Sequence, residues 1–377
     1  MLYLDHNATT PLDPAVRAEM DECLDRAVGN PSSPHGLGQE AKRILDRARA
    51  RVAALVGGRP HEILFTSGGT EADNLAVFGS VAAIPARRHL VSVASEHQAV
   101  RNPVTHLAET GCEVSWAKID CQGRLDPASV AALVREDTAL VSVMLANNET
   151  GVIQPVAELA ETVHAKGALL HSDAVQALGK IPVDVAALGV DLLSLSSHKI
   201  HGPQGVGALY VRAGTRIAPL LFGGHQERGL RPGTENVVGI AGFGKACELA
   251  AVRLTEDACR IARLRDEFET ALRRRLPQIV VHGAGAPRLP NTSYVGFPGL
   301  NGEALALLLD LLGVAVATGS ACSAAAHGPS HVLQAMGLSY QEAASAIRFS
   351  FGREHAAGDI AQAVERVCQA VAELRRS

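Results

Sequence analysis

The sequence has few aromatic residues and no long apolar run. Phe, Trp and Tyr make up 3% of the 377 residues, whereas hydrophobic residues of all kinds make up 47%. An interior built mainly from Ala and Val suits helices and buried parallel strands better than an aromatic-rich β-sandwich. The most apolar stretch, residues 304–317, is interrupted by Asp310 and Gly313, and it is shorter than the ~18 residues that a membrane span needs. We therefore expect a soluble protein that does not contact a membrane.

The seven cysteines include no Cys-x-x-Cys pair. They stand at positions 23, 112, 121, 247, 259, 322 and 368, which is an odd and scattered set. Disulfide frameworks and structural zinc sites both need paired, closely spaced cysteines, so neither is expected. The first residues also lack the basic and apolar regions of a secretory signal. These features predict a cytoplasmic protein without a metal site.

The sequence has no excess of basic residues either. Lys and Arg number 35 against 39 Asp and Glu, which gives a formal net charge of -4. Direct binding of nucleic acid is therefore not expected, because such proteins usually present a basic stripe. At ~150 residues per domain, the length of the chain predicts two domains or three. We place a boundary near residue 255, inside a long helical region predicted for residues 238–276.

Several short apolar runs end in polar side chains. Residues 192–195 lead to Lys199, and residues 167–172 lead to Asp173. Helical segments such as residues 156–166 separate some of these runs, and alternating strands and helices predict a parallel sheet with right-handed crossovers. Ligands of such sheets bind at the carboxyl ends of the strands. Asp173 and Lys199 are therefore expected to point into one crevice.

This pair of residues meets the needs of pyridoxal phosphate. That cofactor requires a lysine that holds it as a Schiff base and a carboxylate that keeps its ring nitrogen protonated. The turn Ser67-Gly68-Gly69-Thr70 follows a predicted strand and opens a predicted helix, so its backbone N–H groups form a candidate phosphate seat. Taken alone, a surface lysine and a plain turn remain the alternatives.

Other polar segments adjoin the same predicted edge. His97 follows the apolar run 89–93, and Asn148 follows the run 140–145. Residues 223–236 form a loop rich in Gly and Arg, and unstructured loops of about 12 residues or more are usually functional. Residues 256–377 predict a smaller α/β unit. Its expected strands are 279–281, 292–295, 314–317 and 346–350, and its expected helices are 301–312, 331–336 and an amphipathic terminal helix.

Together these stretches resemble the cysteine desulfurases of the NifS/IscS type, which belong to the fold-type I, class V aminotransferase-like enzymes. The matching stretches are residues 3–11, 29–33, 66–74, 147–151, 173–176, 196–203 and 319–322. The resemblance implies an α/β fold with a mainly parallel central sheet flanked by helices in a large domain, residues 15–255. A smaller α/β domain, formed by residues 1–14 and 256–377, would carry the cysteine loop.

The resemblance also implies a role for each site residue. Lys199 would form the Schiff base, Cys322 would receive sulfur, and His97 would stack on the cofactor ring and move protons. The other cofactor contacts would come from Gly69, Thr70, Asn148, Asp173, Gln176, Ser196, His198 and, from the second protomer of a homodimer, Thr234. Asn30, Asn148 and Arg348 would hold the substrate. Taken alone, Arg348 fits a structural ion pair equally well, and Asp173 fits a helix cap.

The function expected from the resemblance is the conversion of L-cysteine to L-alanine with pyridoxal 5'-phosphate (PLP). A persulfide on Cys322 would pass to a protein acceptor or scaffold for iron-sulfur cluster assembly, or for thiolation of tRNA or DNA. Gly, Ser and Ala around Cys322 make an uncrowded loop, which suits a nucleophile that must reach the substrate sulfur. A selenocysteine lyase, an aminotransferase and a non-catalytic sulfur-transfer scaffold are the alternatives.

Overall fold

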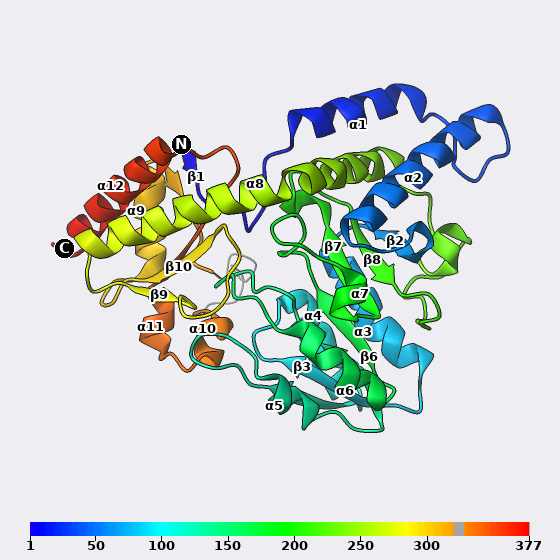
Figure 1. Ribbon diagram of the computed structural model, residues 1–377, viewed down its shortest axis with the longest axis horizontal. Coiled ribbons are helices and arrows are strands. Elements are labelled where there is room, and N and C mark those ends of the chain that lie inside the picture. The colour runs from blue at the N-terminus through cyan, green and yellow to red at the C-terminus, as the bar shows by residue number, and fades with distance from the viewer. Residues whose placement is uncertain (320–327, 377) are drawn as a thin grey trace.

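The computed structural model describes residues 1–319 and 328–376, so the predicted nucleophile Cys322 lies outside the described residues. Two parts of the chain, each with its own sheet and hydrophobic core, are joined by one long helix (Figure 1). Within the described ranges, no helix combines the length and the apolar character that crossing a membrane requires.

A seven-stranded sheet forms the centre of the larger part. Its strand order is β2-β8-β7-β6-β5-β3-β4. The strands are β2 (Ile63–Thr66), β3 (His89–Val93), β4 (Glu113–Ala117), β5 (Thr138–Ser142), β6 (Leu169–Asp173), β7 (Leu192–Ser196) and β8 (Gly207–Val211). All neighbouring pairs are parallel except those that β8 makes with β2 and β7. Strand β8 is antiparallel to β7 because only a short connection joins them, whereas a parallel pair needs a long crossover.

Helices cover both faces of this sheet. Successive residues of a strand point to opposite faces. In β7, Leu193 packs in the larger hydrophobic cluster with α2 (Gly36–Leu55), whereas Leu192 packs in a second cluster with α3 (Gly69–Ala83) and α4 (Gln98–Glu109). Strands buried on both faces are nearly continuous apolar runs, which is why the sequence pattern revealed them. The predicted mainly parallel sheet flanked by helices is confirmed.

Helix α1 (Pro14–Arg26), helix α4 and strand β4 were not predicted from the sequence. Asp13 is the N-cap residue of helix α1, and its Oδ1 accepts a hydrogen bond of 2.7 Å from the backbone N–H of Ala15. An Asp followed by Pro is a recognisable helix start, so this signal was present in the sequence. The remaining short elements of this part are η1 (Pro60–Glu62), α5 (Pro127–Ala131), η2 (Val156–Leu159), α6 (Ala160–Ala165), α7 (Val185–Leu188), η3 (Ser197–Lys199) and η4 (Gln226–Gly229).

The smaller part contains an antiparallel sheet in the order β12-β10-β9. Its strands are β9 (Val280–His282), β10 (Thr292–Gly296) and β12 (Ala346–Ser350), and its helices are α9 (Gly302–Leu311), α10 (His331–Ala335), α11 (Tyr340–Ala344) and α12 (Ala357–Leu374). Strand β1 (Leu2–Tyr3) pairs in parallel with β11 (Val314–Ala315), so the N-terminus and the C-terminus both lie in this part (Figure 1).

Helix α8 (Val237–Arg275) is 39 residues long and connects the two cores. Near its start, Phe243 packs in the hydrophobic cluster of the larger part. Near its end, Phe268 packs in the cluster of the smaller part, against Phe349 at a ring distance of 4.8 Å. The long helix predicted for residues 238–276 is therefore confirmed.

Candidate active site

A cavity of about 210 Å³ lies where the polar loops of the large sheet meet the smaller part. Ten of the predicted site residues line it, namely Gly69, Thr70, His97, Asn148, Asp173, Gln176, Ser196, His198, Lys199 and Arg348. Most of these residues follow the carboxyl end of a parallel strand, which is where ligands bind in such sheets. Tertiary structure thus brings together residues that are up to 279 positions apart in the sequence, as the numbers of Gly69 and Arg348 show.

Lys199 ends η3, directly after β7, and faces the N-terminal loop. Its Nζ donates hydrogen bonds of 2.7 Å to the backbone carbonyl of Asn7 and 2.6 Å to that of Ala8. Asp173 ends the neighbouring strand β6, and its Oδ1 accepts a hydrogen bond of 2.8 Å from the Val175 N–H. Both residues line the same cavity, as their strand-end positions predicted.

Asp173 has partners in the cavity that oppose the effect of burial on its charged form. Burial raises its pKa to about 6, while the Val175 amide and the Lys199 cation both lower that pKa. Asp73 on α3 and Glu96 after β3 are also buried, and burial together with the Asp173 charge raises both of their pKa values well above the ordinary range. Burial and the nearby charge of Asp173 thus both disfavour the ionised forms of Asp73 and Glu96, because like charges in a buried site raise one another's pKa.

His97 precedes α4 and acts as its N-cap. Its Nδ1 accepts a hydrogen bond of 3.1 Å from the Ala99 N–H. Burial, and then the positive charges of Lys199, His331 and Arg348, lower the pKa of His97 to about 4. The ring is therefore neutral at pH 7. Since Nδ1 accepts a hydrogen bond, the single proton of the ring is on Nε2.

The start of α3 provides backbone N–H groups at one end of the cavity. Gly68 is the N-cap residue of this 15-residue helix, and Gly69 and Thr70 are its first two residues. A Cβ atom at Gly69 would lie 2.7 Å from Cγ2 of Val175, so only glycine fits there without a shift. The orphan N–H groups and the helix dipole favour an anion at this end. Ser196 lies beside this turn, with its Cβ 3.5 Å from that same position.

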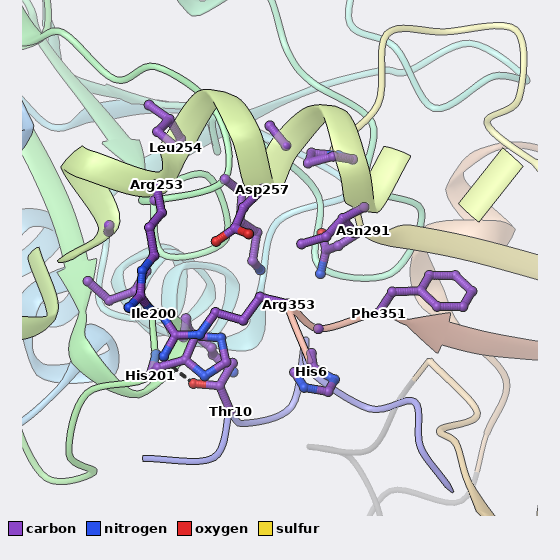
Figure 2. Close-up of a pocket in the computed structure, with 18 residues that line it drawn as sticks. His6, Thr10, Ile200, His201, Arg253, Leu254, Asp257, Asn291, Phe351 and Arg353 are labelled. Carbon is purple, nitrogen blue, oxygen red and sulfur yellow. Dashed lines mark hydrogen bonds between the residues drawn. The ribbon is translucent and has the colours of Figure 1, made fainter. Parts of the chain in front are cut away.

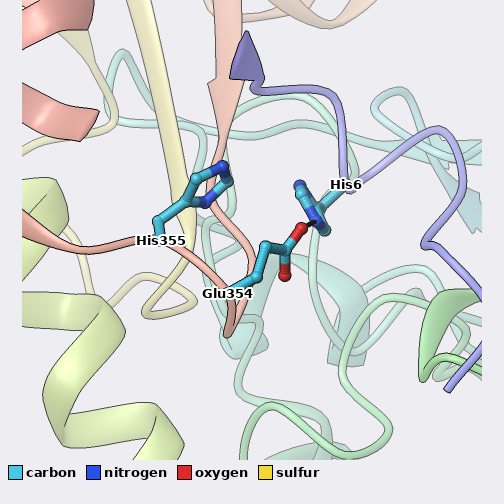
Figure 3. A group of neighbouring side chains, drawn as sticks. All are labelled: His6, Glu354 and His355. Carbon is cyan, nitrogen blue, oxygen red and sulfur yellow. Dashed lines mark hydrogen bonds and ion pairs between the residues drawn. The ribbon is translucent and has the colours of Figure 1, made fainter. Parts of the chain in front are cut away.

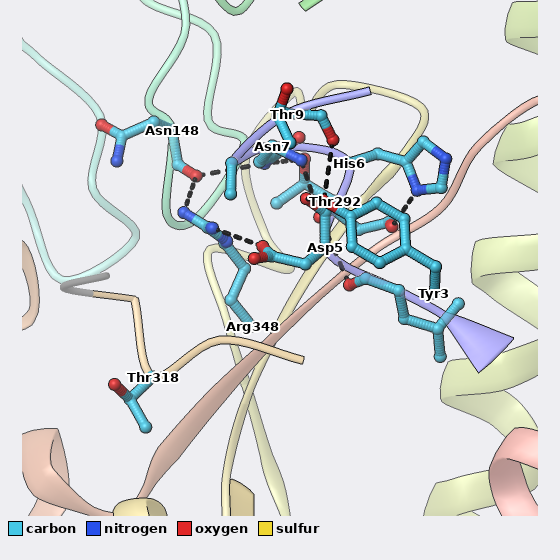
Figure 4. A network of polar contacts seen from close by, with 12 residues as sticks. Tyr3, Asp5, His6, Asn7, Thr9, Asn148, Thr292, Thr318 and Arg348 are labelled. Carbon is cyan, nitrogen blue, oxygen red and sulfur yellow. Dashed lines mark hydrogen bonds and ion pairs between the residues drawn. The ribbon is translucent and has the colours of Figure 1, made fainter. Parts of the chain in front are cut away.

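Arg348 reaches the cavity from β12 of the smaller part. Its two terminal nitrogens donate hydrogen bonds of 3.0 Å to the Asn148 carbonyl and 2.7 Å to Oδ1 of Asp5 (Figure 4). The side chain is buried, and its Nε has no hydrogen-bond partner among the described residues. These contacts hold the guanidinium in one orientation, which suits a planar group that binds carboxylates through two parallel hydrogen bonds.

Asn7 connects the two sides of the cavity and was not singled out from the sequence. Its Nδ2 donates hydrogen bonds of 3.1 Å to the Asn148 carbonyl and 2.9 Å to Oγ1 of Thr292 (Figure 4). Its backbone carbonyl accepts from Nε2 of Gln176 at 2.9 Å as well as from Lys199. Asn7 lies in the stretch 3–11 that carries the resemblance to the cysteine desulfurases, but side-chain pairing across the cavity has no signature in one sequence.

Two predicted residues do not line the cavity. Asn30 is exposed in the loop between α1 and α2, where its Oδ1 accepts a hydrogen bond of 2.9 Å from the Ser32 N–H. Thr234 is exposed in the loop that follows η4. Within one chain, the structure does not bring either residue to the other site residues, and their proposed roles stay predictions.

A second, smaller cavity of about 60 Å³ lies behind Lys199, beneath α8 (Figure 2). Arg253 and Arg353 line this second cavity, and both bind the buried carboxylate of Asp13. His201, which also lines it, has its pKa lowered to about 4, chiefly by burial and then by Arg353. The basic groups here are already engaged within the protein, so the larger cavity is the candidate active site.

His6, Glu354 and His355 lie close enough together to suggest a metal site (Figure 3). However, Nδ1 of His355 accepts a hydrogen bond of 2.8 Å from the Gly352 N–H, so the proton of the neutral ring is on Nε2 and no lone pair is available. Nδ1 of His6 contacts the Ser350 carbonyl at 3.1 Å, and its Nε2 pairs with Glu354 at 2.5 Å. The cluster therefore fastens the N-terminal loop to the chain after β12.

Comparison with known proteins defines the class of this chain. The family model described as "Aminotransferase class-V" matches residues 2–363. Among curated proteins, the cysteine desulfurase of Nostoc sp. is 44% identical over 375 residues, covering 100% of this chain and 94% of that protein. The cysteine desulfurase IscS of Dictyoglomus turgidum is 44% identical over 352 residues, covering 93% of this chain and 89% of that protein.

Solved structures agree with these relatives. A NifS-like protein has a TM-score of 0.92 and 37% identity, covering 99% of this chain and 100% of that chain. DndA from Streptomyces lividans has a TM-score of 0.78 and 37% identity, covering 91% of this chain and 97% of that chain. The chain belongs to the class-V aminotransferase family, and within that family to the cysteine desulfurases.

Proposed function

We propose that this enzyme uses PLP to convert L-cysteine to L-alanine and leaves the sulfur atom on Cys322 as a persulfide. The observation that carries the proposal is that Lys199, Asp173 and Arg348 line one cavity at the carboxyl ends of β6 and β7. A lysine, an ionised carboxylate and a fixed guanidinium are the groups that a PLP enzyme with an amino-acid substrate requires.

The residues of the cavity fit PLP. The N-terminus of α3, with Gly69 and Thr70, can hold the phosphate group, together with Ser196 and His198. Asp173, whose pKa is about 6, is mostly ionised at pH 7 and can pair with a protonated ring nitrogen. When bound, the cofactor supplies an electron sink for the negative charge that forms at the substrate Cα. Lys199, held near the cavity by two backbone carbonyls, is the group that can take the Cα proton.

Arg348 would bind the carboxylate of the substrate. Its orientation is set by Asp5 and by the carbonyl of Asn148. Asn30 is proposed to assist from a second protomer or after movement of its loop, because it is exposed in the described chain. His97 would stack on the cofactor ring, and as a neutral ring with its proton on Nε2 it can donate to the substrate or exchange a proton with it.

The sulfur step needs a thiolate and no oxidant. The thiolate of Cys322 attacks the sulfur of the substrate, the Cβ–S bond breaks, and its electron pair stays on the substrate carbon. A proton then completes the methyl group, so the products are L-alanine and a persulfide on Cys322. Gly319 lines the cavity and precedes Cys322 by three residues, and three residues of chain span at most about 11 Å. A second thiol on a protein acceptor would then take the outer sulfur atom.

The enzyme is proposed to act as a homodimer. Leu220, Leu221 and Phe222, in the loop after β8, are 36%, 53% and 89% exposed. Exposed apolar groups that cluster on one face mark an interface. Leu220 and Leu221 line a surface groove of about 410 Å³ together with Thr70, and Thr70 also lines the active-site cavity. A second copy covering this groove would be placed beside the phosphate seat, where its Thr234 could reach in.

The acceptor is proposed to be a protein of iron-sulfur cluster assembly, or of a tRNA or DNA thiolation pathway, in the cytoplasm. Among the similar proteins, one is named IscS and one DndA. The domain boundary is proposed to lie near residue 255, between the two cores that α8 connects, with residues 1–14 in the smaller domain.

A single-turnover experiment tests the proposed function. The purified holoenzyme is mixed with less than one equivalent of L-cysteine, and its peptides are analysed by mass spectrometry. We expect one added sulfur atom on the peptide that contains Cys322. The Cys322→Ser variant should still change the absorbance of the cofactor when L-cysteine is added, but it should form no alanine. Added sulfur on another cysteine, with Cys322→Ser still active, would contradict the proposal.

A further inference from the structure

Both ends of the segment that contains Cys322 contact one buried polar cluster, which consists of Glu149, Tyr294 and Ser330. The three side chains are buried, and they come from three separate elements. Glu149 follows β5, Tyr294 lies on β10, and Ser330 is the N-cap residue of α10. We call this group the stem cluster. The proposed function assigns no role to any of its members.

The first end of the segment contacts Tyr294 and Glu149. The Tyr294 hydroxyl donates a hydrogen bond of 3.5 Å to the carbonyl of Thr318. Gly319 has a φ of 75°, a left-handed conformation that strains other residues. A Cβ atom at Gly319 would collide with the Tyr294 hydroxyl and would lie 2.9 Å from Oε2 of Glu149. The backbone at Gly319 is therefore pressed directly against the stem cluster.

The second end of the segment contacts the same carboxylate. The Ser330 hydroxyl donates to Oε2 of Glu149 and accepts a hydrogen bond of 3.1 Å from the Leu333 N–H. Ser330 thus caps α10 and ties it to the loop after β5. The next residue, His331, contacts the Glu96 carbonyl through Nε2 at 2.9 Å and lines the active-site cavity.

Glu149 is in turn fixed to the residues that would bind the substrate. Its backbone N–H donates a hydrogen bond of 2.9 Å to Oδ1 of Asn147. The adjoining Asn148 carbonyl accepts hydrogen bonds from Arg348 and Asn7. A buried carboxylate is costly unless it accepts hydrogen bonds, and the Ser330 hydroxyl is such a donor to Glu149. Burial and the Glu149 charge also raise the pKa of Tyr294 well above its ordinary value, so this hydroxyl keeps its proton.

We propose that Glu149 and Tyr294 are positioning residues for the sulfur-transfer step. They hold Gly319, which precedes the Cys322 segment, and Ser330, which follows it, in a fixed position relative to Arg348. This inference rests on the proposed function, because it assumes that Cys322 is the sulfur acceptor. It predicts that removing the stem cluster slows sulfur transfer to Cys322 while leaving the cofactor half of the site intact.

The test separates the two halves of the reaction in the holoenzyme. Exchange of the L-alanine Cα proton in D₂O, followed by NMR, needs the cofactor, Lys199 and Arg348 but no thiol. Persulfide formation on Cys322 needs the same three groups and the Cys322 thiol as well. Its rate is followed by rapid quenching and mass spectrometry. The variants are Tyr294→Phe and Glu149→Gln. The control is Tyr210→Phe, which removes a hydroxyl from another buried tyrosine, on β8.

In Tyr294→Phe and Glu149→Gln we expect α-proton exchange close to the wild-type rate. Persulfide formation should fall by about 10- to 100-fold, the loss expected when a reacting group is displaced by about 1 Å. Tyr210→Phe should change neither rate. Equal loss of both rates in Tyr294→Phe, or no loss of either, would overturn the inference. If Glu149→Gln does not fold, Tyr294→Phe alone decides, since it removes only one oxygen atom.

The wild type distinguishes failure of the proposal from failure of the proposed function. A wild type that exchanges the alanine proton but places no sulfur on Cys322 would overturn the proposed function. A wild type that forms the persulfide, with variants that form it equally fast, would overturn only the role of the stem cluster.

Discussion

The side-chain amine of Lys180 donates a hydrogen bond of 2.7 Å to Oε1 of Gln176. Because Nε2 of Gln176 donates to the Asn7 carbonyl, both ends of the amide are held, and its second N–H is available to the cavity. Burial, and then the charges of Lys199 and Arg348, lowers the pKa of Lys180 well below its ordinary value. Lys180 therefore orients Gln176, which we expect to contact the cofactor.

The variant Lys180→Met should weaken cofactor binding. Loss of one hydrogen bond costs about 1 kcal/mol, which raises the Kd for PLP about fivefold. An absorbance titration of the apoenzyme with PLP measures this change. The control is Lys166→Met, which removes an exposed lysine that pairs with Glu136. An unchanged Kd in Lys180→Met would show that Gln176 keeps its orientation without Lys180.

The variant Lys199→Ala should lose catalysis while its phosphate seat stays intact. Removing a general base that acts on the Cα proton costs about 100- to 10,000-fold in rate, and loss of the covalent link to the cofactor adds to this. Alanine formation and α-proton exchange should both fall, and borohydride should no longer attach PLP to the chain. Lys199→Ala with alanine formation near the wild-type rate would contradict our assignment.

The double variant Leu221→Ser with Phe222→Ser should weaken the homodimer. Replacing two exposed apolar side chains of the proposed interface removes buried apolar area, at about 25 cal/mol per Å². Sedimentation should detect monomer of the double variant at protein concentrations at which the wild type is still a dimer. PLP should be lost as monomer forms. The matched control replaces Leu307 and Leu311, which are 69% and 82% exposed on α9, with Ser. A wild-type monomer that stays fully active at every dilution would contradict the dimeric site.

Acidification below about pH 6.5 should destabilise the fold through its buried histidines. Burial is the main cause that lowers the pKa of five histidines. The pKa is about 3 for His171. It is about 4 for His97, His198, His201 and His282. Their ordinary pKa is about 6.5. Between pH 6.5 and 4 these five histidines bind more protons in the unfolded chain than in the folded chain, so their contribution to the free energy of unfolding falls as the pH falls through this window.

Thermal unfolding measured between pH 7 and pH 4 checks this expectation. The variant His282→Gln removes one buried histidine on β9, away from the active site, so its Tm should depend less steeply on pH. The variant His106→Gln changes an exposed histidine of α4 and should leave the slope unchanged. A Tm that is constant down to pH 4 in the wild type would show that these histidines are not held neutral.

The sequence predicted the elements whose burial leaves a continuous apolar pattern. Strands β3, β6 and β7 are buried on both faces, and α8 has a long helical pattern, so all four could be recognised. Strand β4 was missed because its residues are mostly exposed or half-buried at the edge of the sheet. Helix α1 was missed because only Val16 and Cys23 of its residues are buried, which leaves a weak apolar face.

The sequence by itself determined the class of fold, and the strand-end positions of Asp173 and Lys199 indicated the edge of the sheet that holds the site. Only the tertiary structure decided which distant side chains complete that site. Asn7 joins Gln176, Asn148 and Lys199 through hydrogen bonds that span more than 140 positions of the chain. Burial, which depends on the whole fold, keeps His97 neutral. Local sequence patterns record periodicity and turns. Hydrogen bonds between residues far apart in the sequence, and desolvation of side chains, arise only when separate elements pack together.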